Sequence, residues 1–171
     1  MDALQLRAIL EEGTHCRGWI TNSYAQIEFL LGDLIVRSRW FPEYSEHNST
    51  ISHSATRRVA KVRAMLKITG ALTPYTERLG AILNAFELTH DTRNLLAHGY
   101  CQLHYTPDGD AGLVFQKFDR EAATMTNNDG ARIQRTFRLA DLRQQRDESV
   151  ALAQQALMTF TTVASELGWA D

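Results

Sequence analysis

The chain has 171 residues, a length typical of one domain, and its 44% hydrophobic and 22% charged residues are those of an ordinary soluble globule. A net charge of −2 at neutral pH excludes a strong overall attraction for nucleic acid. We find no apolar run long enough to cross a membrane and no secretory signal, so we expect a cytoplasmic protein with Cys16 and Cys101 reduced. The cysteines and histidines lack metal-site spacing, and we expect neither a metal nor a cofactor.

The first part of the chain predicts two helices. Residues 1–13 have an apolar face and end in Glu11-Glu12-Gly13. Thr14 would cap a second, long helix, roughly 15–39, in which apolar residues recur every three or four positions. Gly32 lies within this pattern, where it either permits close helix approach or is simply tolerated.

Residues 40–55 interrupt the pattern and predict an exposed loop, and residues 55–69 predict the next helix. Residues 51–70 carry five basic side chains and no acidic one. This cationic patch is either a solvated helix face or a contact surface for the phosphates of RNA. The patch consists of Arg57, Arg58, Lys61, Arg63 and Lys67.

Thr73-Pro74 predicts the start of a further helix over 75–98, ending at Gly99 in a glycine C-cap. The period then changes to two, which predicts strands at 100–105, 112–118 and 132–139 with turns at 107–110 and 127–130. Residues 140–167 predict a last helix ended by Gly168. The expected fold is mainly α: a single domain, 1–171, with an up-and-down bundle of four or five helices and an antiparallel β-meander (100–139) inserted before the last helix.

The stretch Arg93-Asn94-Leu95-Leu96-Ala97-His98-Gly99-Tyr100 concentrates the chemistry. Arginine binds phosphate bidentately, and histidine moves protons near neutral pH, so the pair suits cleavage of RNA by its own 2′-hydroxyl to a 2′,3′-cyclic phosphate without a metal. Five residues turn a helix by roughly 140°, so Arg93 and His98 do not share a face. Either the helix frays at Gly99, or two copies build a shared cleft; we favour a homodimer.

The same residues resemble the Arg-x4–6-His motif of the HEPN superfamily, with Asn94 as its polar residue after the arginine. The resemblance implies a dimeric helical bundle, an endoribonuclease with Arg93 and His98 as catalytic residues and Asn94 assisting, and a role as a toxin or in RNA processing or defence. His98-Gly99-Tyr100 also fits toxins paired with nucleotidyltransferase antitoxins, which implies such a partner and makes Tyr100 the counterpart of the tyrosine that is adenylylated. The β-meander departs from the minimal toxin form.

The layout is also similar to the mannitol operon repressor family, which implies a non-catalytic regulatory or interaction protein. In that case Arg93 forms an interface salt bridge and His98 caps the helix end. His90 and Asp91 are supporting candidates for the cleft, or else a packed histidine and a solvated acid.

Overall fold

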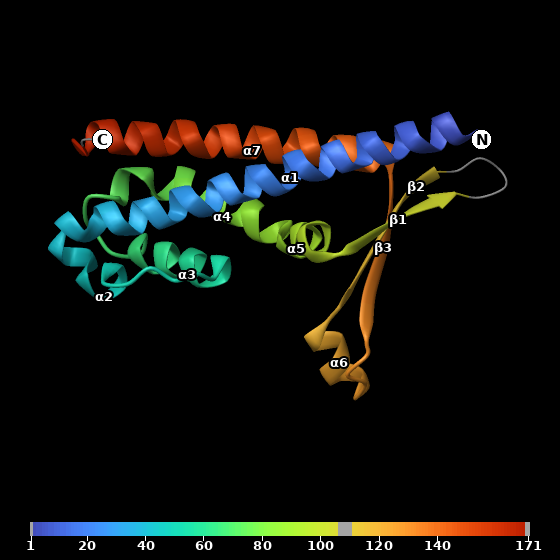
Figure 1. The fold of residues 1–171 in the computed structure, drawn as a ribbon. Coiled ribbons are helices and arrows are strands. Elements are labelled where there is room, and N and C mark those ends of the chain that lie inside the picture. The colour runs from blue at the N-terminus through green and yellow to red at the C-terminus, as the bar shows by residue number, and fades with distance from the viewer. Residues whose placement is uncertain (1, 106–110, 170–171) are drawn as a thin grey trace. The chain divides into compact units, whose positions relative to one another are not determined.

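The computed structural model of the protein describes residues 2–105 and 111–169, and within these ranges it is mainly helical with one small three-stranded antiparallel sheet (Figure 1). The chain forms two compact units. Unit 1 comprises Met1–Thr21 and His90–Ser149, and unit 2 comprises Asn22–Thr89 and Val150–Asp171. In the described ranges, no helix has both the length and the hydrophobicity of a membrane span.

Helix α1 (Ala3–Arg37) is continuous, so the predicted break between two helices is wrong. Its first turn is closed by a reciprocal cap, in which the backbone N–H groups of Asp2 and Gln5 each donate to the other's side chain at 2.9 Å. Gly13 lies inside the helix and is buried, and a Cβ there would overlap the side chain of Leu113. Glycine at this position therefore permits close packing against a strand rather than ending the helix.

In unit 1, strands β1 (Tyr100–Tyr105), β2 (Ala111–Phe118) and β3 (Arg132–Arg138) form the predicted meander in the order β1-β2-β3 (Figure 1). The predicted turn at 107–110 lies outside the described residues. One face of the sheet is packed through Leu113, Phe115 and Phe137, which are at most 3% exposed. The rings of Phe115 and Phe137 meet edge to face at 5.7 Å.

A helix that the sequence did not predict, α6 (Arg120–Thr126), connects β2 to β3. Asp119 caps its first turn by accepting from the backbone N–H of Ala122 at 3.0 Å. Asn127 ends it in the left-handed conformation, with φ of 48°. The predicted turn at 127–130 is therefore real, but it follows a helix rather than a loop.

Unit 2 contains the rest of α1 together with α2 (Ser45–Asn48), α3 (Ala55–Met65) and α4 (Thr76–Leu88). Three 3-10 turns, η1 (Ser38–Trp40), η2 (Pro42–Tyr44) and η3 (Thr73–Tyr75), connect these elements. The expected exposed loop at 40–55 is thus partly ordered and partly buried. Tyr44 is fully buried, and its hydroxyl accepts from the backbone N–H of Leu72 at 2.8 Å.

The helix predicted over 75–98 is two helices, because α4 ends at Leu88 and α5 (His90–His98) begins after Thr89. The Thr89 hydroxyl donates back to the carbonyl of Ala85 at 3.0 Å and accepts from the hydroxyl of Tyr24. Its backbone, with φ −106° and ψ 3°, has left the helical region. A threonine that bonds to the preceding turn in this way competes with regular helix continuation.

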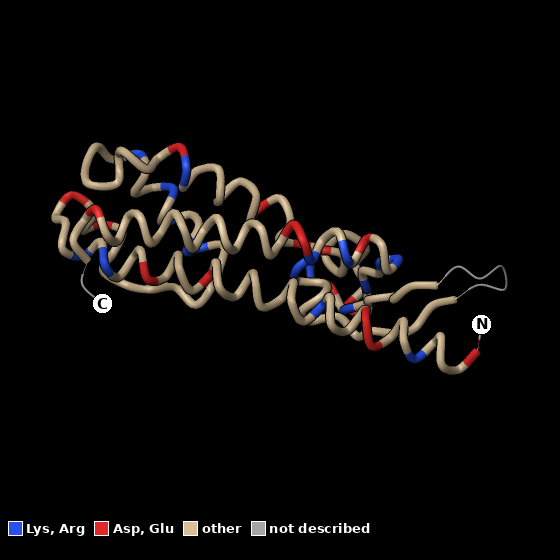
Figure 2. The backbone as a smooth tube through the Cα atoms, turned by 90° about the horizontal axis from the view of Figure 1, so that it is seen from above, with Lys and Arg blue, Asp and Glu red and all other residues tan. Residues whose placement is uncertain are grey.

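The last helix, α7 (Leu139–Glu166), matches the prediction, and Gly168 ends it with φ of 65°. Within unit 1 its first part is tied to α1 by Arg143, whose guanidinium contacts the Glu12 carboxylate at 2.5 and 2.8 Å. Charged positions are sparse along the described backbone, where Figure 2 marks the lysine and arginine positions in blue and the aspartate and glutamate positions in red.

Candidate functional site

The motif lies on α5, a helix of nine residues, and on the turn that leads from it into β1. Leu95 and Leu96 are buried, whereas His98 is exposed. Gly99 ends the helix, as predicted, and its N–H donates to the Leu95 carbonyl at 2.7 Å. Gly99 does not adopt the left-handed conformation of a glycine C-cap, because among the described glycines only Gly168 has a positive φ. A Cβ at Gly99 would instead overlap the Leu95 carbonyl oxygen, so glycine is required by the tight approach.

Arg17 on α1 holds the end of α5, and the sequence did not single it out. Its guanidinium donates to the carbonyl oxygens of Leu96, Ala97 and Gly99 at 2.6, 3.2 and 3.4 Å. The guanidinium carbon also lies 5.5 Å from the ring centre of Phe115. A positive charge on the last carbonyls of a helix satisfies acceptors that have no intrahelical donor. Arg17 therefore fixes the segment that carries His98.

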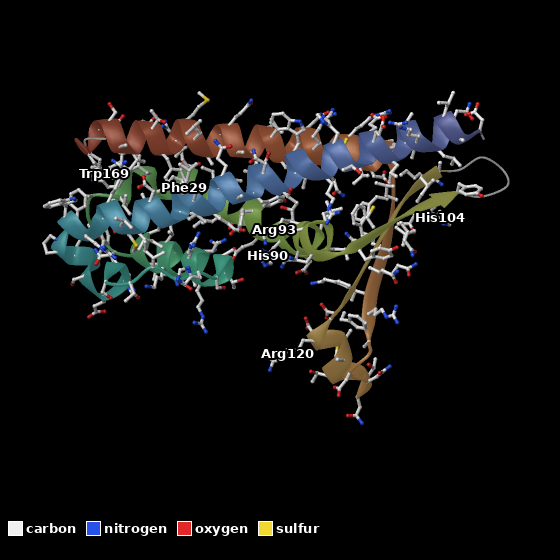
Figure 3. All side chains as sticks on the ribbon, viewed as in Figure 1. Phe29, His90, Arg93, His104, Arg120 and Trp169 are labelled. Carbon is white, nitrogen blue, oxygen red and sulfur yellow. The ribbon has the colours of Figure 1, made fainter. Side chains whose placement is uncertain are left out.

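Three of the predicted site residues form one hydrogen-bonded chain on α5. The Arg93 guanidinium donates to the side-chain oxygen of Asn94 at 2.8 Å, and the Asn94 amide nitrogen lies 2.9 Å from Nε2 of His90. Figure 3 labels His90 and Arg93 on this helix. Asp91, the other supporting candidate, is exposed. The asparagine therefore orients the arginine side chain.

His98 and Tyr100 belong to a different set of residues, which line a surface hollow of about 650 Å³. β1 begins at Tyr100 opposite Gln116, so β2 continues past its partner strand for two residues, Lys117 and Phe118. The hollow, hereafter the His98 notch, forms where the sheet edge is left open beside the end of α5. It is lined by His98, Tyr100, Gln116, Lys117, Phe118 and Arg132.

The His98 notch contains two cations and two exposed aromatic rings, those of Tyr100 and Phe118. The guanidinium of Arg132 lies 5.0 Å from the ring centre of Phe118, which is 68% exposed. Lys117 Nζ lies 3.5 Å from the carboxylate of Asp119, and the α6 N-cap bond from Ala122 lowers the pKa of that carboxyl. The arrangement suits an anion next to a planar group, as in a nucleotide.

The sequence did not predict Lys117, Phe118 and Arg132 as site residues, because they lie on strands separated from the motif along the chain. The pairing register brings them there, with Phe118 opposite Arg132 and Gln116 opposite Tyr100. The only pattern in the sequence that could have pointed to these residues was the alternation of side chains along the predicted strands. Arg93 is not among the described residues that line the notch, which agrees with the rotation between Arg93 and His98 along the helix.

The cationic patch of unit 2 is largely engaged within the unit. Three of its five side chains bind residues of α1, of the segment before α3, or of α4, whereas Arg57 and Lys67 are exposed. This favours the structural interpretation for most of the patch. The three sets of contacts are Arg58 with the carbonyls of Ser52 and Glu28 at 2.6 and 3.0 Å, Lys61 with the hydroxyl of Thr50 at 3.0 Å, and Arg63 with Asn84 and Glu87 at 2.7 and 3.0 Å.

Neither cysteine has the lowered thiol pKa of a nucleophile. Burial raises the pKa of the Cys16 thiol and that of the Cys101 thiol, so both stay protonated at neutral pH. Within residues 2–105 and 111–169, no three histidine, cysteine or acidic side chains come together as a metal site.

Comparisons of this chain with family models, with curated proteins and with solved structures found no match.

Proposed function

We propose that the protein is a homodimeric, metal-independent endoribonuclease of the HEPN type, acting as a toxin or in RNA processing or defence. The observation that carries the proposal is the His98 notch, in which the motif histidine lies beside Lys117 and Arg132. A group that moves protons and two groups that bind phosphate are the components that cleavage of an RNA backbone requires.

In the proposed reaction the ribose 2′-oxygen bonds to phosphorus and the bond from phosphorus to the 5′-oxygen breaks. His98 accepts the proton of the 2′-hydroxyl and returns a proton to the departing 5′-oxygen, so protons balance and no water is consumed. Lys117 and Arg132 bind the phosphate oxygens and stabilise the charge that develops on them. The products are a 2′,3′-cyclic phosphate and a 5′-hydroxyl. DNA lacks the nucleophile and is not a substrate.

Arg93 enters this scheme from a second copy of the chain. Its guanidinium is oriented by Asn94, which is in turn held by His90. In the proposed dimer this oriented arginine of one protomer faces the notch of its partner and completes the charge on the transition state. Tyr100 is 63% exposed and is the proposed position of adenylylation by a nucleotidyltransferase-type antitoxin.

The test is cleavage of a labelled single-stranded RNA by purified protein in the presence of a chelator. We expect the wild type to yield cyclic phosphate ends and the Arg93→Ala and His98→Ala variants each to lose at least about a hundredfold in rate. His53→Ala, which removes an exposed histidine of unit 2, is the matched control and should cleave normally. Equal background cleavage by wild type and the double variant would refute the enzyme.

A second candidate is a non-catalytic regulatory or interaction protein of the same type. The observation that favours it is that the Arg93 guanidinium already donates to Asn94 within its own helix, so it is engaged without a substrate. This candidate predicts that Arg93→Ala/His98→Ala weakens dimerisation, seen by light scattering, and that no RNA is cleaved.

A further inference from the structure

The two faces of the β-sheet differ sharply in what they present. Side chains alternate along each strand, and the pairing register places Leu113, Phe115 and Phe137 on one face, which is packed. Arg135 belongs to this inner face, and its guanidinium donates to the hydroxyl of Thr92 on α5 at 2.8 Å. The opposite face, hereafter the outer face, carries the side chains that alternate with these, and at one end it reaches His98 at the end of α5.

The outer face is polar, basic and aromatic. Its exposed positions on β1 and β3 alternate with the packed ones, and His104 on β1 can be followed in Figure 3. Among the described residues, its side chains include two arginines and three glutamines but no carboxylate. They are Tyr100, Gln102 and His104 on β1, Val114, Gln116 and Phe118 on β2, and Arg132, Gln134, Thr136 and Arg138 on β3.

Two aromatic rings lie exposed at the end of this face that meets the His98 notch. Tyr100 is 63% exposed and Phe118 is 68% exposed. Phe118 is the next outer residue along β2 after Gln116, the partner of Tyr100, so the two rings are diagonal neighbours about 7–8 Å apart at their Cα atoms. A pair of exposed aromatic rings on a carboxylate-free surface suits stacking of bases.

We propose that the outer face is a binding platform for single-stranded RNA, which continues directly into the His98 notch. This rests on the proposed function in taking RNA as the ligand. Tyr100 and Phe118 stack successive unpaired bases, and Arg132 binds the adjoining phosphate. Gln116 and Gln134, in register between the aromatic end and the rest of the face, hydrogen-bond base edges. The platform thereby sets which phosphodiester reaches His98.

The commitment to a single strand follows from the kind of side chains present. In duplex RNA the bases are stacked on each other and have no free faces for Tyr100 and Phe118. Duplex binding depends chiefly on many phosphate contacts, and two arginines on the outer face supply few. The absence of carboxylates on the described outer positions makes the face complementary to a polyanion.

The experiment measures binding separately from cleavage. In a full-length His98→Ala background, fluorescence anisotropy with a labelled 12-nucleotide single-stranded RNA is compared with the same sequence as a duplex and as single-stranded DNA, in chelator and low salt. We expect Phe118→Ala and Tyr100→Ala each to raise the Kd for single-stranded RNA on the order of tenfold. Phe29→Ala, which removes a phenylalanine 70% exposed on α1 in unit 2, should leave the Kd unchanged. Arg132→Ala should likewise raise the Kd, and Arg78→Ala, which removes an exposed arginine of α4, should leave the Kd unchanged.

Each variant should remain folded, because the substituted side chains are exposed, and circular dichroism checks this. The inference is overturned if Phe118→Ala and Tyr100→Ala bind like the His98→Ala protein, if Phe29→Ala loses as much, or if the duplex binds more tightly. Binding that depends on Phe118, in a protein whose wild type cleaves nothing, supports the platform and refutes the nuclease. Cleavage by a wild type whose binding ignores both rings refutes the platform alone.

Discussion

Arg17 is the residue whose removal tests the account of the site most directly. Arg17→Met keeps an unbranched side chain over Phe115 but removes the three guanidinium hydrogen bonds to the end of α5. The donor in all three bonds is the charged guanidinium, and the shortest bond is the one to the Leu96 carbonyl, at 2.6 Å. Such bonds contribute about 1.5–3 kcal/mol, and a charge at a helix C-terminus adds about 0.3–1 kcal/mol.

These contributions overlap, and Arg17 is half-buried, so part of its charge is screened by solvent. We therefore expect Arg17→Met to lower the free energy of unfolding by about 2 kcal/mol. Arg17→Lys retains the charge but not the planar fork, and about half of that loss is expected for it. Arg7→Met on the same helix is the control, because Arg7 makes an exposed pair with Glu11 that contributes less than about 0.5 kcal/mol.

Equilibrium urea unfolding, followed by circular dichroism, gives the free energies. Hydrogen exchange adds a local readout, since the Gly99 amide that donates to Leu95 should lose protection in Arg17→Met. Cleavage or binding at His98 should weaken along with it, because the carbonyls on either side of that residue are then unrestrained. Arg17 does not hold the end of α5 if Arg17→Met is as stable as Arg7→Met and the Gly99 amide exchanges as in the wild type.

Three further predictions follow from the described contacts. Gly18→Ala should raise the free energy of unfolding by about 1 kcal/mol, because Gly18 lies within α1 and an added Cβ meets nothing within 4 Å. Gly99→Ala should lower the free energy of unfolding by about 1–3 kcal/mol, because its Cβ would overlap the Leu95 carbonyl oxygen. Urea unfolding that ranks these two variants in the opposite order would contradict the prediction. Arg58→Ala should lower the free energy of unfolding by about 1–3 kcal/mol in the same assay through two lost carbonyl bonds, and a neutral result would remove its structural role. The hydrogen bond from Arg143 lowers the pKa of Glu12 in the folded protein, so ionised Glu12 stabilises the fold above its unfolded pKa, and this stabilisation is lost as pH falls through the folded pKa. The difference in the free energy of unfolding between wild type and Glu12→Gln should therefore be present at pH 7 and absent at strongly acidic pH. A difference that grows on acidification would contradict this prediction.

The elements with long, regular apolar periods could be predicted, and those fixed by distant partners could not. The period of α7 and the alternation of the three strands both match the structure. Gly13 was expected to end a helix, because glycine usually does so, but here it accommodates Leu113. The sequence did not predict α6, because a helix of seven residues carries too short a pattern to be distinguished from a loop.

The candidate site divides in the same way. The arginine and histidine of the motif, and the expectation that they face different directions, come from spacing within a single helix. The residues around His98 do not, because Arg17 lies 79 residues before the Leu96 carbonyl that it binds, and Lys117 and Arg132 belong to β2 and β3. The break at Thr89, which separates α5 from α4, likewise depends on a hydroxyl contact with Tyr24, 65 residues away.

By itself, the sequence determined that this protein is mainly helical and that a small antiparallel sheet precedes its last helix. Those properties are encoded by neighbours two to four positions apart, whose spacing is visible in the chain. Only the tertiary structure decided which side chains surround His98, which glycines are required by packing, and which cations of the patch are already bound. Contacts of that kind depend on how strands pair and helices approach, and no local spacing records them.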